Sequence, residues 1–163
     1  MNENIVVTGG CGFIGSHLVE LMLDKGYKVN IIDNFSGGNI RNIASFENNS
    51  NLKVWDEDIR DLKPGHKAFI DAKYVFHLAG IGDIVPSIEK PHDYISVNVL
   101  GTRNLLSALK NMNKRPSKIL LASTANIYKS IQSGLIKESD VIDPINPYAK
   151  SKLKMEQMAI ELF

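Results

Sequence analysis

The sequence contains one cysteine among 163 residues, and this scarcity excludes two kinds of site. A single thiol cannot form an intrachain disulfide, and it cannot supply the several cysteine ligands of a metal cluster. We therefore expect no metal, and a reduced, cytoplasmic environment. Cys11 itself lies in a glycine-rich turn as a small residue, where a catalytic thiol is not expected.

Long apolar runs and blocks of like charge are also missing. The composition is 44% hydrophobic and 23% charged, with a formal net charge of +1. The first absence argues against a membrane partner and the second against a nucleic-acid partner. Because an apolar segment begins almost at the first residue, we expect no signal or transit peptide. Residues 1–163 are enough for one domain with a buried core.

What the sequence does contain is an alternation of strand-like and helix-like segments. Strands are predicted at residues 5–7, 27–33, 52–55, 74–80 and 119–123. Helices are predicted at residues 14–25, 94–112 and 148–163, with a short crossover helix between 61 and 71. This alternation over the whole length predicts an α/β fold with a parallel sheet, most simply ordered 3-2-1-4-5.

The segment Thr8–Gly15, with the letters TGGCGFIG, joins the first predicted strand to the first helix. Gly9 would allow a tight turn, Gly12 would leave room for a pyrophosphate, and Gly15 would let the helix pack close to the strand. The free N–H groups and the positive end of the helix dipole would then face the anion. Taken alone, the pattern also fits an ordinary glycine-rich turn.

An acid at the end of the second predicted strand favours a dinucleotide site. Asp33 lies about 20 residues after the glycines. In dinucleotide sites a carboxylate at about this distance binds the adenosine ribose. A polar strand end is common by itself, but both features together predict a dinucleotide cofactor. Since Asp33 would repel a 2′-phosphate and has no arginine immediately beside it, we expect NAD rather than NADP.

Tyr148 and Lys152 are four residues apart on the last predicted helix, so they share one face. A free tyrosine has a pKa of about 10, and a nearby ammonium would favour the phenolate. Tyr148 could then take a proton from a substrate hydroxyl while hydride leaves for the cofactor. Thr124, after the fifth strand, could hydrogen-bond the same oxygen. The spacing alone would also fit a surface helix.

Together these features resemble the amino-terminal half of an extended short-chain dehydrogenase/reductase, in the NAD-dependent sugar-nucleotide epimerase/dehydratase group. The segments that carry the resemblance are Thr8–Gly15, Asp33–Gly37, Asp58–Ile59, His77–Gly80, Asn98–Thr102, Ser123–Thr124 and Tyr148–Lys152. The resemblance implies a Rossmann-type doubly wound parallel sheet. It also implies that the chain ends before the substrate-binding domain that family members carry.

The resemblance further implies a role for each matching residue. The residues that would hold NAD are Gly9, Gly12, Phe13, Ile14, Gly15, Asp33, Asn34, Ser36, Gly37, Asp58, Ile59, Leu78, Ala79, Gly80, Asn98, Ser123, Tyr148 and Lys152. Thr124, Tyr148 and Lys152 would form the catalytic triad, and Ser87 and Thr124 would contact the substrate. Alternatively, Asn98 could be an ordinary polar helix residue, and Ser87 could be a residue that begins a turn and has no contact with substrate. His77 is expected to be a packed strand-end residue rather than a base.

The activity that the resemblance implies is that of a UDP-hexose 4-epimerase acting on a nucleotide sugar. Related 4,6-dehydratases carry acidic residues just after the catalytic Ser/Thr, where this chain has Ala125 and Asn126. A reductase, decarboxylase or dehydratase of the same family remains an alternative, as does a non-catalytic NAD-binding module. Extended relatives pair two helices into a four-helix bundle, which implies a homodimer through residues 94–112 and 148–163.

Overall fold

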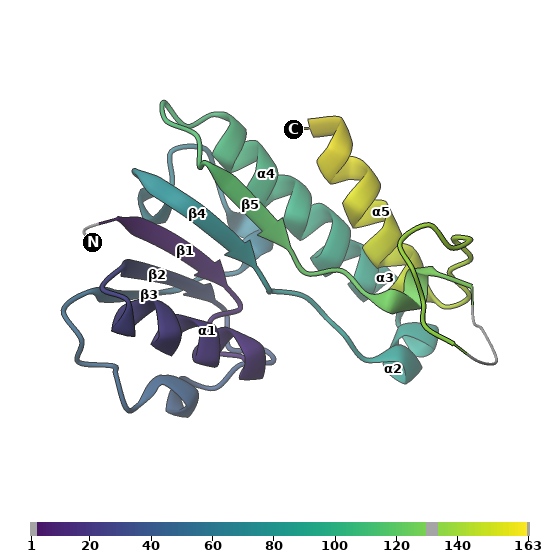
Figure 1. Ribbon diagram of the computed structural model, residues 1–163, viewed down its shortest axis with the longest axis horizontal. Coiled ribbons are helices and arrows are strands. Elements are labelled where there is room, and N and C mark those ends of the chain that lie inside the picture. The colour runs from purple at the N-terminus through teal and green to yellow at the C-terminus, as the bar shows by residue number, and fades with distance from the viewer. Residues whose placement is uncertain (1–2, 130–133, 163) are drawn as a thin grey trace.

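A computed structural model of the protein describes residues 3–129 and 134–162 and contains a five-stranded parallel sheet (Figure 1). The strands are β1 (Asn4–Thr8), β2 (Lys28–Asp33), β3 (Leu52–Asp56), β4 (Ala72–His77) and β5 (Lys118–Leu121). Their order is β3-β2-β1-β4-β5, which confirms the predicted order. The strand order reverses at β1, and such a reversal is where doubly wound sheets bind ligands.

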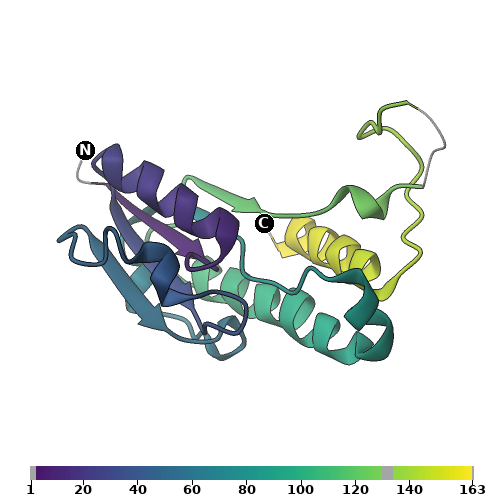
Figure 2. The ribbon, with the colours of Figure 1, turned by 90° about the horizontal axis from the view of Figure 1, so that it is seen from below.

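Helices cover both faces of this sheet. They are α1 (Phe13–Asp24), α2 (Ile84–Glu89), α3 (Pro91–Tyr94), the π-helix η4 (Ile95–Gly101), α4 (Thr102–Lys110) and α5 (Pro147–Leu162), with short 3-10 turns at η1 (Ile40–Ile43), η2 (Ile59–Asp61), η3 (Lys67–Phe69) and η5 (Ala125–Ile127). α1 lies on one face, whereas α4 lies on the other with α5 packed beside it (Figure 2). None of the helices in the described ranges is both long and apolar enough to span a bilayer.

The central strands are apolar on both faces because each face is covered. Ile5 and Val7 pack with Val19 of α1 in one buried cluster. Val6, between them in sequence, packs with Leu105 of α4 in a second cluster on the opposite face. Side chains alternate across a strand, so a run of consecutive apolar residues fills both cores.

The helix ends follow local chemistry. Gly26 takes a left-handed backbone angle, φ +79°, just after α1, as a glycine that ends a helix commonly does. The helix predicted at 94–112 is a longer stretch that begins at Pro91, since proline is favoured in the first helical turn. Its middle, η4, is π-helical and was not predicted. The last helix begins one residue early, at Pro147, and Phe163 lies outside the described residues.

The crossover helix predicted between residues 61 and 71 was wrong. This segment contains only the last residue of the 3-10 turn η2 and the 3-10 turn η3, with Pro64 and Gly65 between them. Proline lacks a backbone donor, and Gly65 has φ +81°, so neither continues a helix. Conversely, α2 forms in a segment for which no helix was predicted.

A row of polar side chains runs diagonally over the sheet, from the start of β1 to the second half of β3. The Asn30 amide donates to Asn4 Oδ1 at 2.6 Å, and Trp55 Nε1 donates to Asn30 Oδ1 at 2.9 Å. Asn4 Nδ2 in turn donates to the carbonyl of Ile70 at 2.8 Å. These bonds join β1, β2 and β3, and they require the register in which Asn4 and Lys28 are partners.

Candidate functional site

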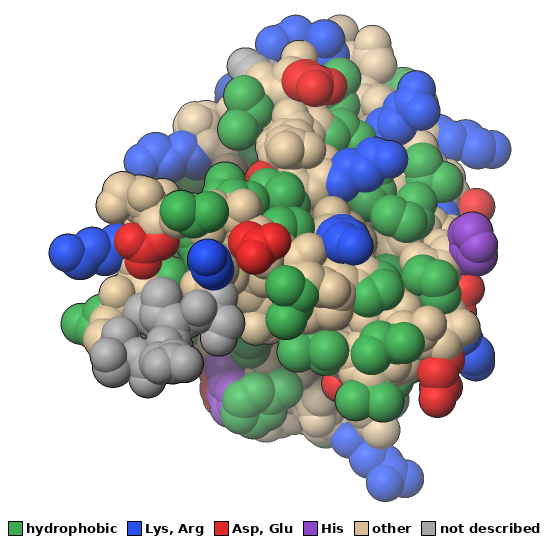
Figure 3. All heavy atoms as spheres, turned by 90° about the vertical axis from the view of Figure 1, so that its right-hand side faces the viewer, with side chains coloured by type: hydrophobic (Ala, Val, Ile, Leu, Met, Phe, Trp, Pro, Cys, Tyr) green, Lys and Arg blue, Asp and Glu red, His purple; other side chains and the backbone are tan. Residues whose placement is uncertain are grey.

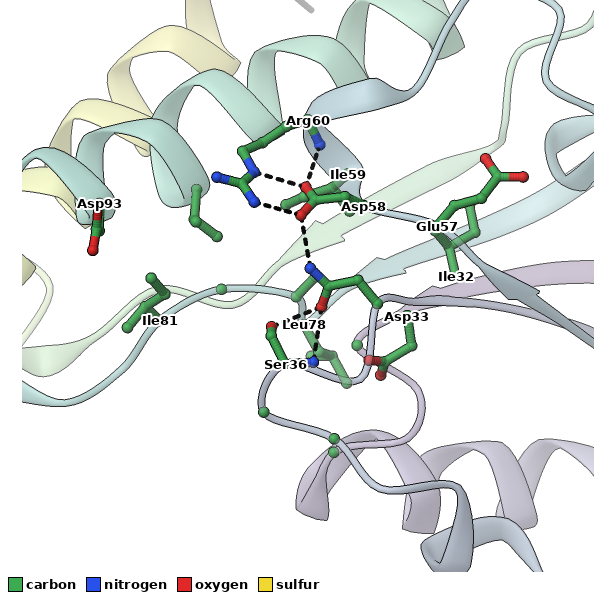
Figure 4. A pocket seen from close by; sticks show the side chains of 18 residues that line it. Ile32, Asp33, Ser36, Glu57, Asp58, Ile59, Arg60, Leu78, Ile81 and Asp93 are labelled. Atoms are coloured by element: carbon green, nitrogen blue, oxygen red, sulfur yellow. Dashed lines mark hydrogen bonds and ion pairs between the residues drawn. The ribbon is translucent and has the colours of Figure 1, made fainter.

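A cavity of about 400 Å³ opens at the carboxyl ends of the central strands (Figure 4). The predicted cofactor residues that line it are Gly9, Gly12, Asp33, Asn34, Ser36, Gly37, Asp58, Ile59, Leu78, Ala79 and Gly80. Residues that line it without having been predicted are Ile32, Gly38, Glu57, Arg60, Ile81, Asp93 and Val97. The cavity therefore gathers segments from β1, β2, β3, β4 and the helix that begins at Pro91.

Close approaches of the main chain explain two of the glycines in the turn after β1. Gly9 has φ +71°, and a Cβ there would lie 2.7 Å from the amide nitrogen of Ala79. A Cβ on Gly15 would lie 2.1 Å from the carbonyl oxygen of Gly9. Either side chain would force the turn apart, so the turn can close against β4 and α1 only with glycine at both positions.

The same turn leaves the start of α1 available to an anion. Gly12 is the N-cap, provides no capping side chain, and is followed by a first turn without acidic residues. The first N–H groups of a helix have no partner within the helix. Phe13 and Ile14 do not line the cavity, and their side chains are 80% and 68% exposed.

Asp33 is buried at the end of β2, and backbone donors fix its carboxylate. Oδ2 accepts from the N–H of Cys11 and Oδ1 from the N–H of Phe35, both at 2.9 Å. Phe35 has φ +56°, a conformation that is uncommon for a bulky residue. Burial and the nearby Asp33 raise the pKa of the Cys11 thiol to about 12. Cys11 therefore remains protonated and is not a nucleophile at neutral pH.

A second set of polar contacts crosses the cavity mouth from β2 to η2. Asn34 Nδ2 donates to Asp58 Oδ2 at 2.7 Å, and Ser36 Oγ donates to Asn34 Oδ1 at 2.7 Å. Arg60 holds both oxygens of the Asp58 carboxylate, with Nε at 2.9 Å and a terminal nitrogen at 2.7 Å. The Arg60 hydrogen bond lowers the pKa of Asp58 to about 2. The sequence could have indicated Arg60, because it follows an N-capping acid by two residues.

Lys152 and Tyr148 do not line the cavity. Lys152 lies beside it, between the ends of β4 and β5. Its Nζ donates to the carbonyl of Ala122 at 2.9 Å, and a Cβ on Gly80 would lie 3.3 Å from it. Burial lowers the pKa of Lys152, and Glu156 opposes the shift. Tyr148 lies one turn earlier on α5 and is half-buried. Its ring packs edge-on against the ring of Tyr94, with centroids 6.3 Å apart.

The hydroxyl of Thr124 lies just beyond β5 and caps η5. It accepts the N–H of Asn126 at 3.2 Å, so its own proton is not used in that bond. Ser123 is exposed and does not line the cavity. Ser87 is fully buried, and its hydroxyl donates to the carbonyl of Ile84 within α2. Of the two predicted substrate contacts, only Thr124 is therefore partly open to solvent.

Asn98 and His77 are buried beside the cavity but do not line it. The Asn98 side chain bonds to both backbone groups of Ile81, which does line the cavity. His77 is 1% exposed, which confirms that it is a packed strand-end residue. Burial, with a smaller contribution from Lys152, lowers the pKa of His77 to about 3. The ring is therefore neutral near pH 7 and is not a general base for an external substrate.

Hydrophobic side chains are exposed at the end of the molecule that carries α2 and the segment before α5. They include Val85, Ile88, Val141 and Ile145, each at least 65% exposed. Figure 3 looks at this end and shows hydrophobic side chains over much of the face. In residues 3–129 and 134–162, no three His, Cys, Asp or Glu side chains form a group that could hold a metal ion.

Comparison with known proteins gives relatives over almost the whole chain. A family model described as GDP-mannose 4,6 dehydratase matches residues 6–162. The bifunctional UDP-glucose 4-epimerase and UDP-xylose 4-epimerase 1 of Pisum sativum is 31% identical over 169 residues, which covers 99% of this chain and 48% of the relative. The chain thus spans about half the length of the curated relatives that it matches.

Two solved structures are similar in the same way. The UDP-N-acetylglucosamine 4-epimerase of Methanobrevibacter ruminantium, in complex with UDP-N-acetylmuramic acid, is 35% identical with a TM-score of 0.85, over 98% of this chain and 50% of that one. The UDP-glucose 4-epimerase of Thermus thermophilus, in complex with NAD, is 31% identical with a TM-score of 0.84, over 97% of this chain and 50% of that one. The parallel sheet, the glycine turn and these matches show that the chain belongs to the epimerase/dehydratase family of extended short-chain dehydrogenases/reductases, as a counterpart of their amino-terminal half.

Proposed function

We propose that this chain is the cofactor-binding portion of an NAD-dependent nucleotide-sugar 4-epimerase of the UDP-hexose type. The observation that carries the proposal is the location of Lys152, which is buried beside the cavity-lining Gly80 and donates to the carbonyl of Ala122 just after β5. A buried ammonium one helical turn from Tyr148 is what a tyrosine base requires. The 4-epimerase names of the similar proteins from pea and Thermus thermophilus support the same activity.

The residues that line the cavity suit NAD. The close main-chain contacts of the turn after β1 require glycine there, so no side chain from Gly9 or Gly12 occupies the space for a pyrophosphate. Gly9 and Gly12 would meet the pyrophosphate, and the start of α1 would contribute unpaired N–H groups. Asp33 would accept hydrogen bonds from the adenosine ribose, since each of its oxygens accepts only one backbone N–H. Asp58 and Ile59 would border the adenine. When bound, NAD would supply the acceptor that removes hydride from the sugar and later returns it.

The protein's own residues would move one proton and hold one oxygen. Lys152 would stabilise the phenolate of Tyr148, which would take the proton of the sugar 4-hydroxyl. Thr124 could donate a hydrogen bond to the same oxygen, because its proton is not used in capping η5. The resulting 4-keto sugar would rotate in the site, so that the hydride returns to the opposite face of C4. Tyr148 would then return the proton, so that only the configuration at C4 changes.

The residues after Thr124 favour epimerisation over dehydration. Ala125 and Asn126 begin η5 and are exposed, and neither carries a carboxyl group. Loss of water from a neighbouring carbon needs an acid and a base there. The dehydratase description of the matching family model therefore names the family rather than this chain's reaction.

A homodimer through the two long helices is proposed as well. Leu100 is 47% exposed and Ile160 on α5 is 80% exposed, so both helices present apolar surface. Sedimentation of the chain at increasing concentration tests this. A monomer throughout the concentration range would contradict the proposal.

Two assays test the proposed function. Titration with NAD, followed by amide chemical shifts, should show weak binding to the 163-residue chain, with shifts at Gly9, Gly12 and Asp33. Incubation with UDP-glucose or UDP-N-acetylglucosamine should give no 4-epimer, because in the family the second half grips the nucleotide. Alignment of reactants can account for about 7–11 kcal/mol of a barrier, and this contribution would be missing.

A chimeric protein would restore the alignment of substrate and cofactor. Fusion of residues 1–163 to the second half of the Thermus thermophilus epimerase should restore 4-epimer formation, and Tyr148→Phe in the fusion should abolish it. Turnover that survives Tyr148→Phe would contradict the assigned base. Net redox turnover with free NAD would favour a reductase, and release of carbon dioxide a decarboxylase. NAD binding without turnover in the fusion would favour a binding module.

A further inference from the structure

A continuous set of buried hydrogen bonds runs from the end of β1 to the π-helix. The N–H of Ala79 donates to Thr8 Oγ1 at 3.3 Å, and Thr8 Oγ1 lies 2.6 Å from His77 Nδ1. On the other side of the ring, His77 Nε2 lies 2.8 Å from Thr102 Oγ1. Thr102 Oγ1 then donates to the carbonyl of Asn98 at 2.7 Å. Thr8, His77, Asn98 and Thr102 are all at most 1% exposed.

The direction of each bond follows from the donors available. A carbonyl can only accept, so the single hydroxyl proton of Thr102 is used on Asn98. Thr102 must therefore accept from His77 Nε2–H, which assigns the proton of the neutral ring to Nε2. Nδ1 is then an acceptor, to which the Thr8 hydroxyl donates. Only this tautomer satisfies every member of the set.

The set continues through the Asn98 side chain to α5. Its Oδ1 accepts the N–H of Ile81 at 2.9 Å, and its Nδ2 donates to the carbonyl of Ile81 at 3.0 Å and to Ser151 Oγ at 2.9 Å. Ser151 Oγ donates to the carbonyl of Tyr148 at 2.7 Å. The strand-end loop at residues 78–81 and the first turn of α5 are thus held by one asparagine, whose own backbone is held through Thr102.

We propose that His77 is a positioning residue, which in its Nε2–H form joins the cavity-lining loop after β4 to the helical turn that carries Asn98. It acts without touching cofactor or substrate: it fixes Thr8 and Thr102, and through Asn98 it fixes Ile81 and the backbone of Tyr148. The inference rests on the proposed dinucleotide function, because the loop that it fixes lines the proposed cofactor cavity.

Thr102 offers a matched pair of variants for the test. Thr102→Val removes the hydroxyl at nearly constant shape, whereas Thr102→Ser keeps the hydroxyl. Val29→Ala, in the buried part of β2 near the opposite end of the sheet, serves as a control for general loss of stability. All are compared in the 163-residue chain, under conditions in which each remains folded.

The first readout is hydrogen exchange at the amides of Ala79 and Ile81 without any ligand. Thr102→Val should speed exchange at both amides on the order of tenfold relative to Thr102→Ser, because a buried partner is left unsatisfied. Val29→Ala should change these amides only as much as it changes the slowest-exchanging core amides. Equal exchange in the Val and Ser variants would overturn the proposal, whatever the cofactor result.

The second readout is NAD affinity from the amide titration. Thr102→Val should weaken binding several-fold, while Thr102→Ser and Val29→Ala should bind as the unsubstituted chain does. If all four proteins bind NAD equally, the positioning role fails and the dinucleotide function stands. If none binds NAD, the dinucleotide function fails, and the exchange data still decide whether His77 orders the loop. Nitrogen spectra that place the ring proton on Nδ1 at pH 7 would also overturn the proposal.

Discussion

The polar side chains at the two ends of the site are held in opposite ways. At the proposed adenosine end, Asn34, Ser36, Asp58 and Arg60 bond to one another at the surface, within two adjoining loops. At the proposed catalytic end, the set from Thr8 to Ser151 is buried beside the cavity and joins β1, β4, η4, α4 and α5. Water can replace a bond at the first end but cannot reach most of the second. The first end is therefore adjustable, and the second behaves as one unit.

The largest expected effect comes from the turn that both ends share. Gly15→Ala should destabilise the fold by about 3 kcal/mol or more, because its Cβ would overlap the carbonyl of Gly9 and the backbone must move. Gly37→Ala is the control, since a Cβ at Gly37 meets nothing within 4 Å. Urea unfolding measures both. Similar stabilities for the two variants would mean that the turn is far more compliant than its contacts indicate.

Acid should weaken the buried end before the exposed one. The unfolded chain binds a proton at His77 below about pH 6.5, but the folded ring does so only near its pKa of about 3. Stability present above pH 6.5 is therefore lost as the pH falls toward 3, by about 2–3 kcal/mol at pH 4.5. Asp58, with its pKa lowered to about 2, contributes stability that is lost only below about pH 4.

Unfolding free energies of the chain and of His77→Gln measure this acid effect. The variant should be less stable at pH 7, but its stability should fall less between pH 6.5 and 4.5. Parallel pH profiles would show that other groups cause the loss.

Cofactor choice should depend on the adenosine end. NAD should bind at least about tenfold more tightly than NADP, a difference of about 1.4 kcal/mol, because the fixed Asp33 carboxylate would repel a 2′-phosphate. Asp33→Asn keeps a hydrogen-bond acceptor but removes the charge, so it should reduce the ratio of NAD affinity to NADP affinity. Competition titration with both dinucleotides gives the numbers. Equal or tighter binding of NADP by the unsubstituted chain would contradict the predicted preference for NAD.

The smallest effect is expected for the exposed ion pair between Arg60 and Asp58. Arg60→Ala should lower stability by at most about 1 kcal/mol, because the guanidinium side chain is 45% exposed and such pairs are weakened by water and salt. Thermal unfolding at low and high salt measures it, and the loss should shrink as salt is added. A loss of several kcal/mol would mean that the adenosine end is as cooperative as the buried end.

The sequence was sufficient for the features that depend on local chemistry. The strand order and the cavity-lining residues Gly9, Gly12 and Asp33 follow from short patterns of glycine, acid and apolar residues. The other predicted residues that line the cavity were implied by the resemblance to the family. β4 ends at His77, however, three residues before the predicted strand end, because Leu78, Ala79 and Gly80 leave the sheet to line the cavity. A continuous apolar run contains no signal for that departure.

The features that were missed depend on contacts between distant segments. Nothing near Asn98 in sequence indicates a π-helix, and its partners Ile81 and Ser151 are 17 and 53 residues away. Asp93 and Val97 line the cavity only because the helix from Pro91 runs past it. Ser87 matched a family position, yet the formation of α2 turns its hydroxyl to the carbonyl of Ile84.

The row of Asn4, Asn30 and Trp55 has a consequence for the route by which the chain folds. The strands of a parallel sheet pair only after long connections close, so wrong registers have time to form. A slip of β2 by one residue would turn Asn30 to the opposite face and leave the indole N–H of Trp55 without its acceptor. Misaligned sheets would therefore be less stable and would open again. The row would therefore favour the native register during folding.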